Sequence, residues 1–376
     1  MSKNIIVSNR LPVQINIEND LLEVIPSVGG LATGMKSIHA EGDGIWIGWS
    51  GLEDNKATRK KQLKVDEALL KEKCVSVALT KNDIDDFYLG FSNKTLWPLF
   101  HYFTEYTSFE NKQWLSYKEV NKKFADVVLA NSEDGDVIWI HDYQLLLLPA
   151  LIKAERPNSK IGFFLHIPYP SFEIFRIFPW REELLQGMLG ADLLGFHTYD
   201  YERHFLSSVK RILRLEVNFN QIIYEDRVIK VDSFPMGIDY DKFYNAALEK
   251  LNNTEAEKSD LQHRLDDHIK AASGTQLILS IDRLDYTKGI PNRIKAFEYF
   301  LNQHPEYKEK VRLIMLAVPS RSNVPQYKRL KKETDELVGR INGQFSTVNW
   351  TPIWYFYRSV PFNNLIDLYT SADKSQ

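Results

Sequence analysis

The sequence predicts an α/β protein with doubly wound parallel sheets. Short, nearly continuous apolar runs alternate with longer amphipathic segments, which is typical of buried parallel strands joined by helices. The runs that we predict as strands are Ile5–Ser8, Val137–Ile140, Ile161–Leu165, Leu193–Phe196, Leu277–Ile281 and Leu313–Leu316. The helices between them are predicted at Leu31–Ala40, Asn111–Asn131, Gln144–Glu155, Arg181–Leu189, Tyr199–Leu213, Lys288–Asn302 and Val324–Asn342.

The chain has 376 residues, which is long enough for two domains. A charged, polar segment at residues 248–273 interrupts the alternation of strands and helices, which resumes at Leu277. We therefore place a boundary near residue 245 and predict domains at 1–245 and 246–376. The second domain offers about three convincing strands, whereas a doubly wound nucleotide-binding domain usually has six, so we expect it to be incomplete.

Composition narrows the class of protein. The net charge of -3 argues against a dominant role in binding nucleic acid or an anionic membrane. Cys74 is the single cysteine, so neither an internal disulfide nor a thiolate metal site is expected. The sequence has no signal-peptide pattern and no apolar run near the roughly 20 residues that span a bilayer. We expect a cytoplasmic protein.

Three predicted strands end in residues that suit a polar ligand. Arg10 ends the first strand, Asp142 follows the second, and His166 follows the third. Ligands of open α/β sheets bind at the carboxyl ends of the strands. There Arg10 suits an anion, Asp142 suits sugar hydroxyls, and His166 suits a hydrogen bond to a sugar or developing positive charge. Taken alone, Arg10 is better explained by a surface salt bridge, and His166 is explained equally well as a buried histidine bound to a carbonyl.

Cations gather around the later strands. Arg283 and Lys288 flank a turn between a strand and a helix, and a planar fork beside a point charge suits a diphosphate. Arg321 follows the next strand. The pair Gly29-Gly30 precedes a predicted helix, where backbone amides approach a phosphate closely, although a tight turn explains the pair equally well. Three converging cations fit a phosphorylated substrate better than a neutral one.

Aromatic residues with polar atoms form another candidate group. Trp49, Tyr88 and Trp97 have rings that stack on or orient a sugar, although core packing is the default in a chain with 12% aromatic residues. The neighbours His141 and Asp142 suggest a metal pair, but adjacent strand residues point to opposite faces. No other ligand spacing occurs, so we expect no metal.

These segments together resemble the trehalose-6-phosphate synthases, which are retaining glucosyltransferases with two Rossmann-like domains facing a cleft, the GT-B arrangement. The resemblance covers essentially the whole chain, and the ordered set is far more specific than any single motif. The matching motifs are Ser8-Asn9-Arg10, Gly29-Gly30-Leu31, Gly48-Trp49-Ser50-Gly51, Phe91-Ser92-Asn93, Leu96-Trp97-Pro98, Trp139-Ile140-His141-Asp142-Tyr143, Phe164-Leu165-His166-Ile167-Pro168, Gly195-Phe196-His197-Thr198, Arg283-Leu284-Asp285-Tyr286-Thr287-Lys288-Gly289, Gly339-Arg340-Ile341-Asn342-Gly343 and Trp350-Thr351-Pro352.

The resemblance implies a role for each candidate. The acceptor glucose 6-phosphate would be bound by Arg10, Trp49, Tyr88, Trp97, Asp142 and Arg321, with the two arginines on its phosphate. The donor UDP-glucose would be bound by Gly29, Gly30, His166, Arg283, Lys288 and the backbone of Val360. The residues implied in catalysis are Asp142, His166, Arg283 and Lys288. No cofactor, metal or protein nucleophile is implied.

Family members continue past Ser371-Ala372-Asp373 into an Asp-Gly-Met-Asn run and a glutamate that binds the donor ribose. The chain lacks both, and Lys374-Ser375-Gln376 does not resemble the family's next strand. We therefore expect a C-terminally truncated synthase with reduced activity and a tendency to form homo-oligomers. Three alternatives remain: a non-catalytic sugar-phosphate-binding regulatory subunit or synthase fragment, a glycosidase that uses Asp142 and Asp285, and a related synthase that makes another pseudo-disaccharide phosphate. The glycosidase does not explain the clustered cations.

Overall fold

A computed structural model describes residues 3–18, 21–27, 30–31, 34–35, 39, 42, 44–252, 263, 276–321, 324–372 and 374–375. The chain forms two compact units, Met1–Ile238 and Asp239–Gln376. The division therefore precedes helix α11 (Tyr240–Asn252), whereas the sequence places it near residue 245. The helix belongs to the second unit because it packs on α15 (Phe362–Ser371), with the rings of Phe243 and Phe362 5.3 Å apart.

The first unit is built on a nine-stranded sheet with the order β5-β4-β1-β6-β7-β8-β11-β10-β9. Its strands are β1 Asn4–Arg10, β4 Ile45–Trp49, β5 Cys74–Ser76, β6 Val137–His141, β7 Lys160–Phe164, β8 Leu193–Phe196, β9 Val217–Asn218, β10 Gln221–Tyr224 and β11 Arg227–Ser233. Neighbours from β5 to β11 are parallel, and the last two pairings are antiparallel. The four strands predicted here are confirmed as β1, β6, β7 and β8.

Helices connect these strands. They are α2 Lys56–Arg59, α3 Gln62–Lys71, α4 Lys81–Asp83, the π-helix η1 Ile84–Leu96, α5 Trp97–Phe100, η2 Thr104–Tyr106, α6 Asn111–Asn131, η3 Tyr143–Leu145, α7 Leu148–Glu155, α8 Phe172–Phe175, α9 Arg181–Met188, α10 Tyr199–Ser208 and η4 Val209–Leu213. Helix α6 has the predicted bounds, and α7 begins later than predicted because η3 precedes it. The predicted helix Leu31–Ala40 lies only partly within the described residues, where residues 31, 34, 35 and 39 are helical.

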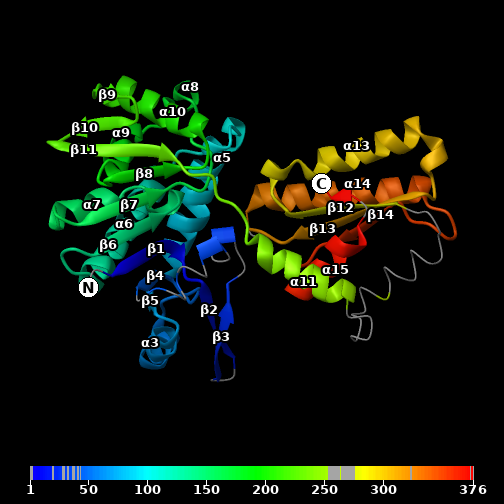
Figure 1. Ribbon diagram of the computed structural model, residues 1–376, viewed down its shortest axis with the longest axis horizontal. Helices are drawn as coiled ribbons and strands as arrows, with labels where there is room; N and C mark the ends of the chain where they lie inside the picture. The colour runs from blue at the N-terminus through cyan, green and yellow to red at the C-terminus, as the bar shows by residue number, and fades with distance from the viewer. Residues whose placement is uncertain are drawn as a thin grey trace. The chain divides into compact units, whose positions relative to one another are not determined.

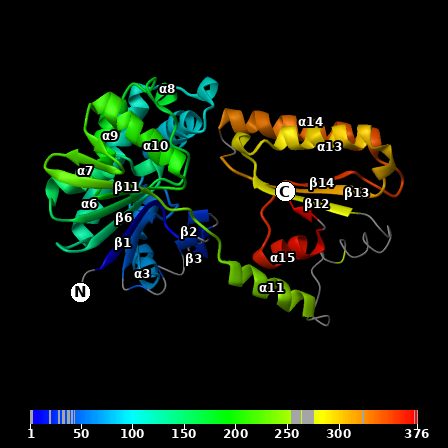
Figure 2. The same cartoon turned by 45° about the horizontal axis from the view of Figure 1, so that its top comes forward.

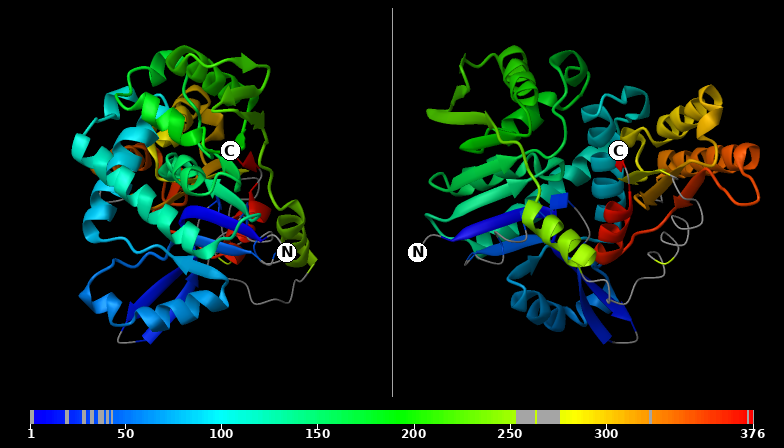
Figure 3. Two further views of the ribbon diagram at one scale, coloured as in Figure 1. Left: turned by 90° about the vertical axis from the view of Figure 1, so that its left-hand side faces the viewer. Right: turned by 45° about the vertical axis from the view of Figure 1, so that its right-hand side comes forward.

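A hairpin of β2 (Val13–Glu18) and β3 (Leu21–Pro26) stands apart from the large sheet and runs beside α3 (Figure 3). Its residue Ile15 shares one apolar cluster with Val65 and Leu69 of α3. Helix α3 is therefore anchored by one apolar face, as expected for an amphipathic helix.

The second unit has a parallel sheet with the order β14-β13-β12-β15 among the described residues. Its elements are β12 Gln276–Arg283, η5 Tyr286–Lys288, α13 Ile290–Gln303, η6 Pro305–Tyr307, β13 Val311–Val318, α14 Pro325–Phe345, β14 Ile353–Phe356 and β15 Lys374–Ser375, besides α11 and α15. Lys374–Ser375 forms the short strand β15, which pairs in parallel with Ile278 and Leu279.

Helices cover both faces of this sheet. Leu313 and Met315 of β13 belong to one apolar cluster with residues of α13 and α14, while Ile314 and Leu316 belong to a second cluster with Leu368 of α15. Figures 1 and 2 show α13 and α14 on one side of the sheet and α15 on the other. Side chains of a strand alternate between faces, so a strand buried on both sides needs the continuous apolar run that the sequence shows. The α/β fold class is confirmed.

Candidate active site

The polar residues predicted in the first unit lie together at the carboxyl ends of the parallel strands of the large sheet. Strands β4, β1, β6, β7 and β8 are parallel neighbours, so their carboxyl ends lie at the same edge. The residues at or just after these ends are Trp49, Arg10, His141 with Asp142, His166 and His197, in that order across the sheet.

The Arg10 side chain lies against two aromatic rings. Its guanidinium carbon is 4.4 Å from the ring centroid of Trp49 and 5.3 Å from that of Tyr88. The two rings meet edge to face with centroids 6.1 Å apart, and the indole Nε1 of Trp49 donates to the carbonyl of Leu52 over 2.6 Å. A guanidinium on a ring face gains cation–π attraction while its donors point out along its own plane. The rings therefore orient a cation that suits a phosphate.

The backbone at Arg10 is fixed by β4. A Cβ on Gly48 would lie 2.7 Å from the carbonyl oxygen of Ser8, so only glycine lets the two strands approach this closely. The Ser8 hydroxyl donates to the Arg10 carbonyl over 2.7 Å and accepts from Nε1 of Trp46, also over 2.7 Å. The Trp46-Ile47-Gly48-Trp49 motif thus positions Arg10 as well as contributing a ring.

The π-helix η1 carries Tyr88 and is tied to the Asp142 turn. Asn93 donates from Nδ2 to the carbonyl of Tyr88 over 2.7 Å and accepts from the hydroxyl of Tyr143 over 2.9 Å. Both Asn93 and Tyr143 are buried. π-Helical turns are rare and often occur at functional sites. Sequence reasoning missed these two residues as members of the site, although both lie within matched motifs.

Trp97 is buried among other rings. Its ring centroid lies 4.2 Å from that of His101 and 5.6 Å from that of Tyr143. Only 5% of Trp97 is exposed. These contacts pack the base of the site, and a contact of Trp97 with a sugar stays a prediction.

Asp142 has an unusual backbone conformation. Its φ of 75° and ψ of 169° fall in a region populated almost only by glycine, which costs a non-glycine residue about 1–3 kcal/mol. Its amide donates to the carbonyl of Phe164 over 2.8 Å, and its Oδ1 accepts the amide of His166 over 3.2 Å. The rule of alternating faces does not hold at this residue, because β6 ends at His141.

A buried scaffold from α6 holds the turn after Asp142. The hydroxyl of Tyr117 donates to the carbonyl of Tyr143 over 2.8 Å and accepts the amide of Leu146 over 3.0 Å. Asn121 donates from Nδ2 to the carbonyl of Gln144 over 3.0 Å. This network stabilises the strained conformation at Asp142, and strain maintained in this way is typical of functional sites.

Three histidines lie side by side at this edge. Nδ1 of His141 is 3.0 Å from Nε2 of His166, and the ring centroids of His166 and His197 are 5.6 Å apart. Burial lowers the pKa of His166 to about 3, holds the pKa of His141 well below its usual range, and lowers the pKa of His197. All three rings are therefore neutral near pH 7, and His166 acts as a neutral hydrogen-bonding group.

The second unit places its cations at the carboxyl ends of its strands. Arg283 ends β12 and Lys288 ends η5, and both residues are exposed. Gly289 follows with a φ of 63°, a left-handed conformation that favours glycine, and α13 then begins at Ile290. Arg321 follows the neighbouring strand β13, whose Val318 pairs with Arg283.

Arg321 is already engaged in a buried network. Its Nη1 lies 3.1 Å from Oδ2 of Asp285, which also accepts the hydroxyl of Tyr327 over 2.8 Å. The other oxygen of Asp285 accepts the amide and the hydroxyl of Thr287, each over 3.0 Å. Asp285 is completely buried. This carboxylate therefore serves the fold, which counts against the glycosidase alternative.

The remaining predicted residues have fewer contacts. Gly29 lies outside the described residues, and Gly30 is helical with nothing within 4 Å of an added Cβ. Val360 is partly buried against the apolar cluster that contains Leu277 and Ile314. Because Arg10 and Arg321 belong to different units, a phosphate site shared between them stays a prediction.

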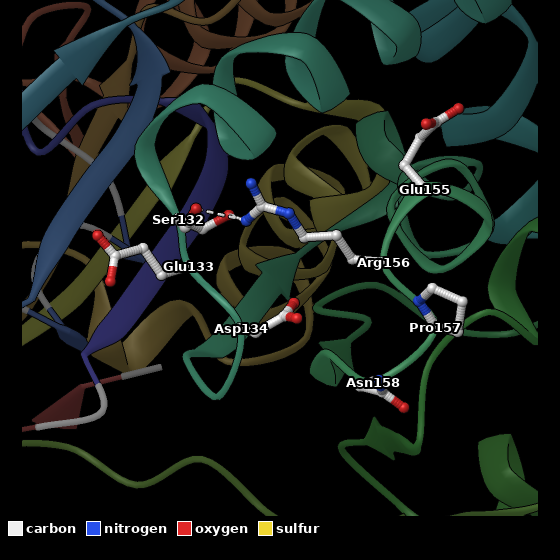
Figure 4. Close-up of a pocket in the computed structure, with 7 residues that line it drawn as sticks. All are labelled: Ser132, Glu133, Asp134, Glu155, Arg156, Pro157 and Asn158. Carbon is white, nitrogen blue, oxygen red and sulfur yellow. Dashed lines mark hydrogen bonds between the residues drawn. The ribbon is translucent and has the colours of Figure 1, made fainter.

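A surface hollow lies at the amino ends of strands β6 and β7 in the first sheet (Figure 4). Its lining consists of residues 132–134 and 155–158, in the loops that precede β6 and β7. Arg156 points across it and donates to the hydroxyl of Ser132 over 2.6 Å and to the carbonyl of Leu129 over 2.7 Å. The hollow is at the amino ends of the strands, so it is separate from the row of site residues, and Arg156 ties the two loops together.

In the part of the chain that the structure describes, no group of three or more His, Cys, Asp or Glu side chains is placed to hold a metal ion. No helix among the same residues has the length and apolar character that crossing a membrane requires. Burial raises the pKa of the Cys74 thiol to about 12, which keeps it protonated and unreactive.

The chain consists of two α/β units whose parallel sheets carry ligand-type residues at the carboxyl ends of their strands, which is the architecture of Rossmann-like ligand-binding proteins. The family model described as glycosyltransferase family 20 matches residues 2–375. The chain belongs to this family.

Sequence relatives give the same assignment. An alpha,alpha-trehalose-phosphate synthase (UDP-forming) of Pichia angusta is 44% identical over 98% of the chain and 78% of its own length. A bifunctional trehalose-6-phosphate synthase/phosphatase of Thermoproteus tenax is 42% identical over 98% of the chain. The chain spans half the length of that relative.

A solved structure of high similarity has the same fold. It is described as trehalose-6-phosphate from E. coli bound with UDP-2-fluoro glucose. It has a TM-score of 0.83 and 30% identity, over 100% of this chain and 77% of its own. The resemblance to the trehalose-6-phosphate synthases and the Rossmann-like fold of each unit, both expected from the sequence, are thus confirmed.

Proposed function

We propose that this chain transfers glucose from UDP-glucose to glucose 6-phosphate with retention, which yields trehalose 6-phosphate and UDP. The observation that carries the proposal is the row of residues at the carboxyl edge of the first sheet. It combines the guanidinium of Arg10, which lies against aromatic rings, the carboxylate of Asp142, whose backbone is strained, and the neutral imidazole of His166. A phosphate, a sugar hydroxyl and a donor sugar are the groups that these three side chains suit.

The acceptor glucose 6-phosphate is proposed to bind to Arg10, to the aromatic residues beside it and to Asp142. Arg10 binds the phosphate of glucose 6-phosphate. Trp49 and Tyr88 hold the guanidinium of Arg10 in place and contact the sugar, as does Trp97. Asp142 accepts a hydrogen bond from the acceptor hydroxyl that attacks. Arg321 is proposed as a second phosphate ligand from the other unit, with its orientation set by Asp285.

The donor UDP-glucose is proposed to bind to residues of the second unit and to the pair Gly29-Gly30. Arg283 and Lys288, both exposed at the end of β12 and its turn, bind the diphosphate. Gly29 and Gly30 are proposed to let the backbone approach the diphosphate closely because they lack side chains, and the backbone of Val360 is proposed to contact the base. The two cations stabilise the negative charge that develops on the diphosphate as it departs, which is charge stabilisation specific to the transition state.

The chemistry needs no nucleophile from the protein. The bond from the glucosyl carbon to the diphosphate oxygen breaks, and a bond to the acceptor oxygen forms on the same face. The acceptor proton passes to an oxygen of the departing diphosphate, so the atoms balance without a protein base. The positive charge on the glucosyl carbon favours a neutral neighbour, and burial keeps His166 neutral.

Product formation tests the proposal directly. The purified chain of 376 residues is incubated with UDP-glucose and glucose 6-phosphate, and trehalose 6-phosphate is measured by mass spectrometry. We expect product from the unchanged chain and none above background from Arg283→Ala. A folded chain that binds glucose 6-phosphate but makes no product would instead support the alternative of a non-catalytic sugar-phosphate-binding protein.

A further inference from the structure

His141 contacts His166 at the centre of the row of site residues. It is the last residue of β6, it is completely buried, and the plane of its ring is tilted by 36° from that of His166. Its Nδ1 lies 3.0 Å from Nε2 of His166. His166 is thus held twice, by His141 at its ring and by Asp142 at its amide.

The direction of this hydrogen bond follows from the other nitrogen of His141. A neutral imidazole has one N–H donor and one acceptor nitrogen, so one ring donates and the other accepts. Nε2 of His141 is buried, and no group among the described residues hydrogen-bonds to it. Buried N–H groups without an acceptor are rarer in proteins than acceptors without a donor. Nδ1 of His141 therefore carries the proton and donates.

We propose that His141 is a positioning residue that fixes the tautomer of His166. When Nε2 of His166 accepts from His141, the proton of His166 must reside on its Nδ1. His166 then presents an N–H donor rather than a lone pair to its ligand. This inference rests on the proposed function, in which that ligand is a hydroxyl of the donor glucose, and it adds a residue to which that function gives no role.

The tautomer matters because it sets the direction of the hydrogen bond between His166 and the sugar hydroxyl, which can donate as well as accept. Without the His141 bond, either nitrogen of His166 can hold the proton, and part of the population presents the wrong one. The ring also loses the contact that fixes its rotation. The expected cost is that of one hydrogen bond, or about tenfold in rate.

Nitrogen NMR tests the assignment without any need for turnover. In protein with ¹⁵N-labelled histidine, long-range nitrogen–proton spectra report which nitrogen of each ring is protonated. We expect the Nδ1–H form for both His141 and His166 in the unchanged chain, and a mixture of tautomers for His166 in His141→Leu. A His141 that is protonated at Nε2, or a His166 that stays purely Nδ1–H in His141→Leu, overturns the inference.

Kinetics separate positioning from a structural role. His141→Asn places an amide donor near the position of Nδ1, whereas His141→Leu has a similar size and no donor. Per folded molecule, we expect His141→Leu to lose about tenfold in kcat with an unchanged KM for glucose 6-phosphate, and His141→Asn to recover most of the loss. Equal kcat values for both variants and the unchanged chain contradict positioning.

The two experiments also distinguish this inference from the proposed function. An unchanged chain that makes no trehalose 6-phosphate refutes the proposed function, whereas the NMR result alone then decides whether His141 sets the tautomer of His166. An active chain in which the His166 tautomer does not respond to His141→Leu supports the function and refutes the inference.

Discussion

Arg321 and Asp285 form an ion pair inside the second unit, with Nη1 3.1 Å from Oδ2 and side chains that are only 7% and 0% exposed. Tyr327 and Thr287 complete the ring of donors around the carboxylate. One arginine is thus required by the fold and, in the proposed function, by the acceptor phosphate. Substitutions at the two residues are expected to have different consequences.

Removal of the carboxylate is expected to destabilise the second unit strongly. Asp285→Asn leaves the guanidinium of Arg321 buried without its counter-charge, a situation that costs about 3–5 kcal/mol. Urea unfolding measures the loss. The matched control is Glu298→Gln, since the Arg340 partner of Glu298 is 51% exposed and an exposed pair contributes about 0–1 kcal/mol. Equal losses for the two variants would show that the Asp285 pair is not buried in solution.

A charge-conserving change at Arg321 separates its two roles. Arg321→Lys keeps a positive charge for Asp285 but lacks the planar fork that binds a phosphate at two points. We expect the affinity for glucose 6-phosphate to fall at least about tenfold, the cost of one charge-assisted hydrogen bond, while the affinity for UDP stays unchanged. Titration calorimetry at a temperature where the variant is folded measures both. Equal losses for both ligands count against Arg321 as an acceptor ligand.

The backbone of Asp142 gives a prediction about stability. A residue at φ 75° and ψ 169° is strained unless it is glycine. We expect Asp142→Gly to be more stable than Asp142→Ala by about 1 kcal/mol or more, and both to lose activity with the carboxylate. Thermal unfolding measures the order. The same pair of changes at the exposed Asp126, within helix α6, is expected to give the opposite order, with alanine the more stable.

Much of the fold was predictable because it depends on local patterns. Strands β1, β6, β7, β8, β12 and β13 are continuous apolar runs, and burial on both faces of a parallel sheet leaves that pattern in the sequence. Strand β4 was missed because its five residues include Gly48 and two tryptophans, which resemble a turn with aromatic side chains. The π-helix η1 was missed because its apolar spacing differs from the 3.6-residue period of an α-helix.

The candidate site was predictable only in part. Residues such as Arg10 and Asp142 follow predicted strands, so a general rule about strand ends points to them. The partners of these residues come from distant segments: Asn93 and Tyr143 are 50 positions apart, and His141 and His166 are 25 apart. No sequence period encodes such pairs, because they depend on which strands become neighbours. The role of Asp285 was likewise hidden, since a buried and an exposed aspartate are identical in sequence.

The three neutral histidines predict a steep loss of stability in acid. Burial lowers the pKa of His141 and His166 in the folded chain, while the unfolded chain keeps a value near 6.5. Below pH 6.5 the unfolded chain therefore binds more protons than the folded chain, so stability falls as the pH falls toward 4. Urea unfolding across this range measures the slope of the unfolding free energy against pH.

His141→Asn removes one of these buried histidines, and the slope of the variant is expected to correspond to about one proton fewer. A slope unchanged in His141→Asn would mean that His141 is not held neutral by the fold.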